Sequence, residues 1–181
     1  MKKKYITDCA YPDYNFDKIT DITPADLKIM GVKTVAIDLD NTTVPYSSLR
    51  LEKGVKKWID EMRENGIKVI IVTNALIGRS FILSKKMGNI PFIPLAFKPS
   101  PVALRIASFF LDVENEEMAM IGDQLFTDVL AANRLGAVSV KVEPLGEDGW
   151  LFKRYFKTKR ELELLYLRNF ENPSGEILQQ A

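Results

Sequence analysis

The stretch KTVAIDLD, residues 33–40, decides the fold of this chain. Its apolar residues run on without alternation, which is typical of a strand covered on both faces of a parallel sheet. The strand ends in two acids, Asp38 and Asp40, and a small polar cluster follows at 41–43. Strands usually end in turn residues such as Gly, Asn or Pro, so two carboxylates at this end need a chemical reason.

Working outward from this strand, the rest of the chain alternates between strand and helix. We expect further strands at 67–74, 90–96, 117–123 and 137–145 and helices at 21–31, 51–66, 78–88, 100–113 and 127–136. Ser100 is the expected N-cap of its helix, with Pro101 at the first helical position. Residues 1–22 show no clear period.

This alternation predicts an α/β fold of the Rossmann-like type. Right-handed crossovers between parallel strands give a doubly wound sheet in a three-layer α/β/α sandwich. The length of 181 residues suits one domain over 1–181, with the core at about 33–145 and the N-terminal helix and C-terminal tail packed on it.

Composition narrows the chemistry. Lys plus Arg number 25 and Asp plus Glu 24, so the net charge of +1 argues neither for nor against a nucleic-acid or membrane partner, and we do not expect nucleic acid. Cys9 is the one cysteine, which excludes an intrachain disulfide and fits a cytoplasmic location. The absence of histidine excludes Ser–His–Asp and Cys–His catalysis and histidine metal sites. We expect neither a signal peptide nor a transmembrane segment, since no apolar run approaches ~18 residues.

Polar side chains gather at the points where the strands stop. In doubly wound sheets the ligand binds at the carboxyl ends of the strands, so these residues are expected to converge. They are Asp38, Asp40, Thr73, Asn74, Lys98, Asp123 and Asp128.

This set of side chains matches the needs of phosphoryl transfer. A carboxylate can attack phosphorus, and a second carboxyl can protonate the leaving oxygen and then deprotonate water. Oxygen ligands suit Mg²⁺, which takes one or two carboxylates and the substrate phosphate. A hydroxyl, a backbone N–H and a lysine can stabilise the transferring phosphoryl group.

The pattern resembles the haloacid dehalogenase (HAD) phosphohydrolases. Asp38-x-Asp40-x-Thr42 is similar to their first motif, Thr73 to the second, Lys98 to the third and Gly122-Asp123-x4-Asp128 to the fourth. The stretches DITPADLKIMGVKTVAIDLDNTTVP and IGDQLFTDVLAANRLGA resemble more narrowly the YqeG-type HAD phosphatases, which are relatives of mitochondrial phosphatidylglycerophosphate phosphatases. Thr43 departs from that pattern, because an apolar residue is usual there.

The resemblance implies a role for each residue. Asp38 would be the nucleophile and a Mg²⁺ ligand, and Asp40 the general acid/base and a ligand through its carbonyl. Asp123 would also bind Mg²⁺. Phosphate binding would fall to Thr73, the Asn74 backbone and Lys98, with Lys98 also bridging to Asp38, and Thr42 and Asp128 would support the site.

Each motif alone also suits a plainer reading. Asp-x-Asp-x-Thr could be a solvated turn, Lys98 a surface lysine, and Thr127 or Asp128 a residue that caps or begins a helix. The four motifs occur in the right order, each at a strand end, which favours the catalytic interpretation.

The spacing of the motifs leaves room for one helix between Thr42 and Thr73, and for one helix and one strand between Asn74 and Lys98. We therefore expect no cap domain and an open site. An open site admits phosphate on a lipid head group, a protein or a nucleic-acid end, or on a sugar if oligomerisation supplies a wall.

The tail GWLFKRYFKTKRELELLYLRNF, residues 149–170, mixes basic and aromatic residues. Over 150–159 these suit an anionic lipid surface, and also nucleic acid. The alternative is a helix over 160–170 that packs Leu162, Leu165, Tyr166 and Phe170 on the sheet.

The sequence thus predicts a Mg²⁺-dependent phosphatase that hydrolyses a phosphomonoester. If this substrate is phosphatidylglycerophosphate, the enzyme would meet it at an anionic membrane surface. The location would then be cytoplasmic and peripheral to the membrane. The alternatives are a phosphatase for a soluble sugar or nucleotide phosphate and a regulatory binding protein without catalysis.

Overall fold

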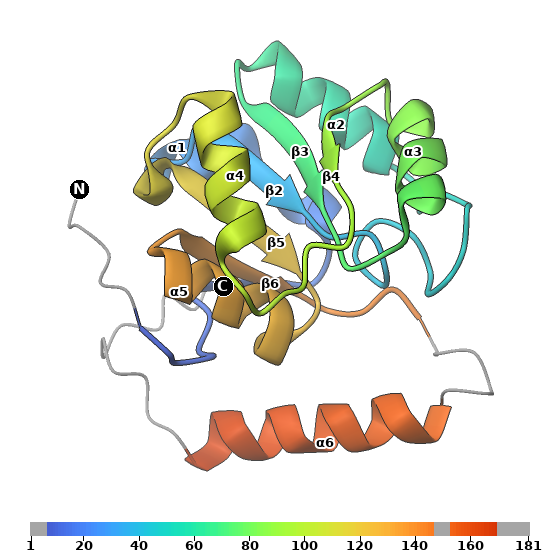
Figure 1. Cartoon of the computed structure of the whole chain (residues 1–181), viewed down its shortest axis with the longest axis vertical. Coiled ribbons are helices and arrows are strands. Elements are labelled where there is room, and N and C mark those ends of the chain that lie inside the picture. The colour runs from blue at the N-terminus through green and yellow to red at the C-terminus, as the bar shows by residue number, and fades with distance from the viewer. Residues whose placement is uncertain (1–6, 147–152, 170–181) are drawn as a thin grey trace.

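The structure, a computed structural model, describes residues 7–146 and 153–169, with the side chains of the second range described for 158–168 (Figure 1). The strands are β1 (Tyr14–Phe16), β2 (Thr34–Ile37), β3 (Lys68–Val72), β4 (Phe92–Ile93), β5 (Met118–Gly122) and β6 (Val138–Val142). The α-helices are α1 (Pro24–Ile29), α2 (Val55–Glu64), α3 (Ile77–Lys86), α4 (Val102–Leu111), α5 (Leu130–Leu135) and α6 (Lys153–Asn169). A π-helical turn, Leu125–Val129, precedes α5.

The described strands form one parallel sheet in the order β1-β6-β5-β2-β3-β4. β2 lies between β5 and β3, so the acids that follow it lie near the middle of the carboxyl edge. The N–H of Asp38 still donates to the carbonyl of Ile121, at 3.0 Å, which carries the pairing up to the first acid.

Helices cover both faces of the sheet, as the unbroken apolar pattern of β2 predicts. Val35 and Ile37 pack in a core that includes buried residues of α2 and α3, whereas Ala36 packs in a second core with α4 and α5. The α/β/α sandwich and the doubly wound sheet are therefore confirmed.

Several helix and strand ends differ from those expected. α2 begins at Val55 and not near 51, because Gly54 before it has a positive φ of 91°. α4 begins at Val102 with Pro101 as N-cap, so the prediction of Ser100 as the cap is wrong. The strand expected at 90–96 is reduced to Phe92–Ile93.

β1 was not expected, because residues 1–22 lack a period. Tyr14–Phe16 pairs with β6 at the edge of the sheet. The pairing begins at Asp13, whose side chain accepts hydrogen bonds from the backbone N–H and the hydroxyl of Ser139, both at 2.7 Å. A strand of three residues that is held in place by one side chain is too short to show a strand-like apolar pattern in the sequence.

α6 packs through other residues than those expected. Leu162 and Leu165 are 55% and 51% exposed, so the prediction that they pack on the sheet is wrong. Instead Glu163 is buried and accepts a hydrogen bond from the N–H of Leu125 at 2.9 Å, and the Tyr166 hydroxyl accepts one from Ala10 at 2.9 Å. These bonds set the rotation of the helix. Phe170 and residues 150–152 lie outside the described residues.

No helix in the described ranges is both long enough and apolar enough to cross a membrane.

Candidate active site

A cleft of about 370 Å³ lies at the carboxyl edge of the sheet and brings five of the predicted site residues together. They are Asp38, Asp40, Thr73, Asn74 and Lys98. The other three, Thr42, Asp123 and Asp128, are buried. Topology alone accounts for this convergence, since four parallel strands present their ends at one edge.

Lys98 lies at the centre of the site. Its Nζ contacts Asp38 Oδ1 at 2.8 Å and Asp128 Oδ1 at 2.6 Å, and donates to the Val72 carbonyl at 2.9 Å. Burial by itself lowers the pKa of Lys98, but Asp128 and Asp38 outweigh it and raise that pKa above the ordinary value. Lys98 is thus a fixed positive charge at the base of the cleft.

Three carboxylates crowd around this charge. Oxygen atoms of Asp38, Asp123 and Asp128 lie within 4.8 Å of one another. Asp123 Oδ1 is buried without a hydrogen-bond partner among the described residues. Burial, followed by the negative charges of Asp128 and Asp38, raises the pKa of Asp123 well above its ordinary value. One lysine does not balance three acids, so the site is complementary to a further cation.

Gly122 allows Asp128 to come this close. A Cβ on Gly122 would lie 2.3 Å from the carboxylate carbon of Asp128, a distance that atoms not bonded to each other do not reach. The other carboxylate oxygen of Asp128 accepts from the N–H of Gln124 at 3.1 Å. Gly122, the last residue of β5, is therefore a steric requirement of the site.

The loop after β2 is tied back on itself. Thr43 Oγ1 is 3.1 Å from the carbonyls of both Asp38 and Leu39, which gives this unusual threonine a structural role. Asn41 turns the chain with a positive φ of 58°, a conformation that asparagine tolerates. Thr42 is buried, and its hydroxyl has no hydrogen-bond partner among the described residues.

Arg79 holds Asp40 and was missed by the sequence reasoning. Its guanidinium binds the two carboxylate oxygens of Asp40 at 2.6 and 2.7 Å and donates to the Ser48 carbonyl at 2.9 Å. The N–H of Ser47 donates to Asp40 at 2.7 Å as well. A positive charge in the first turn of a helix is unfavourable, because the helix N-terminus is itself positive. The position of Arg79 in the sequence could therefore have indicated that it needs an acidic partner.

The side chain of Asn74 also helps to hold the site together, whereas the resemblance implies a role only for its backbone. Its amide accepts from the Lys98 N–H at 2.9 Å and donates to the Lys98 carbonyl at 3.3 Å. Thr73 Oγ1 accepts from the N–H of Ala75 at 3.2 Å, which leaves its own hydrogen available for an oxygen in the cleft.

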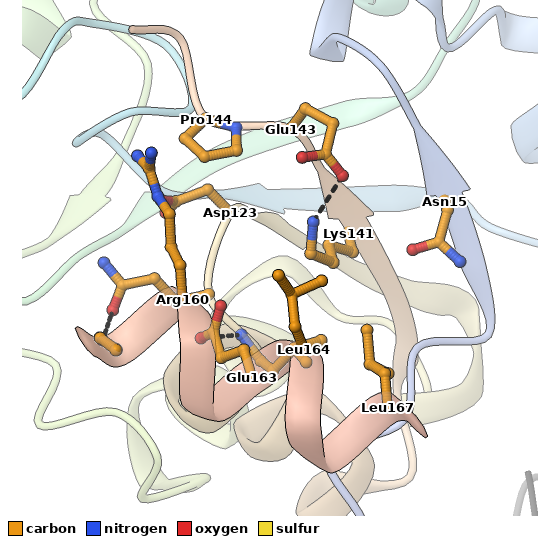
Figure 2. A pocket seen from close by; sticks show the side chains of 12 residues that line it. Asn15, Asp123, Lys141, Glu143, Pro144, Arg160, Glu163, Leu164 and Leu167 are labelled. Carbon is orange, nitrogen blue, oxygen red and sulfur yellow. Dashed lines mark hydrogen bonds and ion pairs between the residues drawn. The ribbon is translucent and has the colours of Figure 1, made fainter. Parts of the chain in front are cut away.

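A second cavity, of about 190 Å³, lies beside Asp123 between α6, β6 and β1 (Figure 2). Gln124 lines both cavities. Figure 2 shows Arg160 reaching from α6 toward Asp123 and Pro144, with the Lys141–Glu143 ion pair on the opposite wall. α6 therefore covers one side of the loop that carries Asp123.

Residues 96–144 match the family model of HAD-hydrolase-like proteins. The chain is 38% identical over 155 residues to the probable phosphatase YqeG of Bacillus subtilis, a match that covers 86% of this chain and 87% of the relative. It is 25% identical over 107 residues to ribulose-1,5-bisphosphate 5-phosphatase of Halopiger xanaduensis, of which the match covers 45%.

Solved structures agree at the level of fold. The cobalt-bound deoxy-D-mannose-octulosonate 8-phosphate phosphatase of Haemophilus influenzae superposes with a TM-score of 0.53 at 17% identity, covering 82% of this chain and 98% of that one. A hypothetical protein from Xanthomonas campestris gives 0.54 at 16% identity, covering 77% and 79%.

The parallel sheet with its acids and lysine at the carboxyl edge is the architecture of a HAD-type phosphatase. The chain belongs to the HAD superfamily of phosphatases, in its YqeG-type subfamily.

Proposed function

We propose that the chain is a Mg²⁺-dependent phosphomonoester hydrolase that works through an aspartyl-phosphate on Asp38. The observation that carries this proposal is the position of Lys98, which contacts Asp38 and Asp128 at the base of an open cleft. Beside it, Asp123 presents a buried carboxylate oxygen that has no hydrogen bond within the described part of the chain.

The donor set fits Mg²⁺. Asp38 and Asp123 would hold the ion through carboxylate oxygens and Asp40 through its carbonyl, and Asp128 would support them from its bonds to Lys98 and Gln124. When bound, the ion supplies Lewis-acid stabilisation of the charge on the phosphoryl oxygens.

The side chains then divide the reaction into two displacements. The Asp38 carboxylate, whose Oδ1 accepts a hydrogen bond from Lys98, attacks phosphorus while the bond from phosphorus to the leaving oxygen breaks. Asp40 gives its proton to that leaving oxygen. It then takes a proton from the water that attacks the aspartyl-phosphate, which releases inorganic phosphate and restores Asp38. Thr73 donates its hydroxyl hydrogen to the phosphoryl group, and Lys98 balances the phosphoryl charge.

For the substrate we propose a phosphate carried on a lipid head group, with phosphatidylglycerophosphate as the first candidate by family resemblance. In support, a single helix joins β2 to β3 and another joins β3 to β4, segments that lack the length of an inserted cap domain. A soluble sugar phosphate is the second candidate, favoured by the partial similarity to the ribulose-bisphosphate phosphatase.

Asp38→Asn tests the mechanism. We expect turnover of p-nitrophenyl phosphate and of phosphatidylglycerophosphate in detergent micelles to be lost, because an amide does not attack phosphorus. Asp8→Asn is the matched control, since Asp8 is an exposed acid paired with Arg134 away from the cleft. Near wild-type kcat for Asp38→Asn would refute the aspartyl-phosphate, and faster hydrolysis of ribulose bisphosphate than of the lipid would favour the second candidate.

A further inference from the structure

One long segment of the chain contains no acid. Between Glu64 and Asp112 there is no Asp or Glu, whereas there are six cations, Lys68, Arg79, Lys85, Lys86, Lys98 and Arg105. This segment runs from β3 through α4 and includes the edge strand β4. Lys98 is buried in the site and Arg79 is paired with Asp40, so the exposed cations of this segment are Lys68, Lys85, Lys86 and Arg105.

The same segment carries most of the exposed apolar side chains. Ten of the fifteen large hydrophobic residues that are exposed in the described structure lie between 76 and 110. Five of these, which we name the apolar lip, lie in the loops after β3 and β4 or in the first turns of α3 and α4. They are Leu76 (70% exposed), Ile77 (64%), Leu95 (43%), Phe97 (76%) and Val102 (55%).

The lip borders the catalytic cleft. Leu76 lines the cleft directly. The N–H of Leu95 donates to the Ala75 carbonyl at 3.1 Å, which joins the loop after β4 to the loop after β3. The Asn74 side chain clamps the backbone of Lys98, the residue next to Phe97. A surface that bound the lip would therefore face the opening above Asp38.

Backbone strain accompanies this exposure. Leu95 and Phe97 have positive φ angles of 49° and 51°, a conformation that bulky side chains rarely adopt. Their neighbours Ala96 and Lys98 are buried, so the strained loop sends Lys98 into the site and the two apolar side chains outward. Strain in a loop that exposes Leu and Phe at a cleft indicates a functional use of these side chains.

We propose that the apolar lip docks on the surface of an anionic lipid bilayer and brings the cleft to a phosphate on a lipid head group. This inference rests on the proposed function. The lip side chains enter the interfacial region, and exposed cations such as Lys85 and Arg105 are attracted to anionic head groups.

Charge favours a membrane over a second copy of the chain. A symmetric contact between two copies through the lip would bring the exposed cations of two acid-free segments toward one another, and like charges across an interface are unfavourable. The lip also lies in a different part of the sequence from 150–159, whose basic and aromatic residues suit an anionic lipid surface, so the two stretches can be tested separately.

The test compares two triple variants in sedimentation with vesicles. Ile77→Gln, Leu95→Asn and Phe97→Asn form the lip variant, with asparagine chosen because it tolerates positive φ. Ile29→Gln, Leu162→Gln and Leu165→Gln form the control, since these are three exposed aliphatic residues outside the lip. The vesicles contain phosphatidylcholine and phosphatidylglycerol in equal amounts, or phosphatidylcholine alone.

We expect the wild type and the control to bind the anionic vesicles at low salt, and the lip variant to bind at least about tenfold more weakly. Equal binding by the lip variant, or no binding by the wild type, would overturn the proposal. So would a wild-type dimer in light scattering that the lip variant dissociates. Turnover of p-nitrophenyl phosphate should be unchanged in the lip variant, which separates a failure of docking from a failure of the phosphatase mechanism.

Discussion

At the scale of single residues, the site depends on contacts that leave no spare volume. Gly122 faces the carboxylate of Asp128, which is itself held by Lys98 and by the N–H of Gln124. Asp128 is buried, with one oxygen in an ion pair with Lys98 and the other accepting from Gln124, so a shift of its side chain would break both contacts.

Gly122→Ala should therefore disrupt the site. We expect a loss of most phosphatase activity and a destabilisation of about 1–3 kcal/mol, since an overpacked core is strained. Thermal unfolding and kcat measure both effects. Gly146→Ala is the control, because a Cβ at Gly146 would meet no atom within 4 Å. Wild-type activity in Gly122→Ala would show that Asp128 is free to move.

Arg79 is the second residue whose substitution has a specific expected effect on catalysis. In Arg79→Met, Asp40 loses its two guanidinium bonds and keeps the one from Ser47. We expect kcat to fall about 10²-fold with little change in KM, because a displaced acid/base group slows chemistry more than binding. Arg79→Lys should not restore the rate, since an ammonium cannot bind both oxygens in a fork. The exposed Arg63→Met is the control, and an unchanged kcat in Arg79→Met would remove Arg79 from the positioning of Asp40.

At the scale of elements, α6 is coupled to the loop that carries Asp123. Buried Glu163 accepts from the N–H of Leu125, two residues after Asp123, and Lys159 bonds to Gln124. Burial raises the pKa of Glu163 above its ordinary value, which the bond from Leu125 only partly offsets.

A raised carboxyl pKa gives a defined dependence of stability on pH. The folded state holds the Glu163 proton more tightly than the unfolded state, so protonation of Glu163 stabilises the fold. This contribution to the free energy of unfolding is complete below the unfolded pKa of about 4.3, and it is lost as pH rises through the raised folded pKa. In Glu163→Gln that decrease should disappear, while Gln still accepts from Leu125. Glu163→Ala should lose about 1–3 kcal/mol at all pH values, because the buried N–H of Leu125 loses its partner. Urea unfolding at several pH values tests this, and identical pH profiles for wild type and Glu163→Gln would contradict it.

At the scale of the whole molecule, the crowded carboxylates predict that Mg²⁺ stabilises the fold. Asp38, Asp123 and Asp128 repel one another around one lysine, and a cation that binds only the folded state would relieve this repulsion. Mg²⁺ at 100 times its Kd should stabilise the folded state by about 2.7 kcal/mol and raise Tm.

EDTA should abolish activity, and beryllofluoride should inhibit by imitating the phosphoryl group on Asp38.

Asp123→Asn separates charge repulsion from metal binding. Without metal its Tm should be higher than that of the wild type, because one buried charge is removed. Added Mg²⁺ should then raise the Tm of the variant far less than that of the wild type. A wild-type Tm that does not respond to Mg²⁺ would exclude this metal from the site.

The sequence by itself determined the sheet and the convergence of the site residues. An unbroken apolar strand such as 33–40 must be covered on both faces, and parallel strands must end at one edge. Asp38, Thr73, Lys98 and Asp123 therefore had to meet, however far apart they lie in the chain. What only the tertiary structure decided was the set of partners that hold these groups. Arg79 reaches Asp40 across 39 positions, β1 pairs with β6 through Asp13, and α6 is rotated by Glu163 so that Leu162 and Leu165 are exposed. Such contacts have no local period or motif, because each arises only after packing has placed distant polar groups within hydrogen-bond distance.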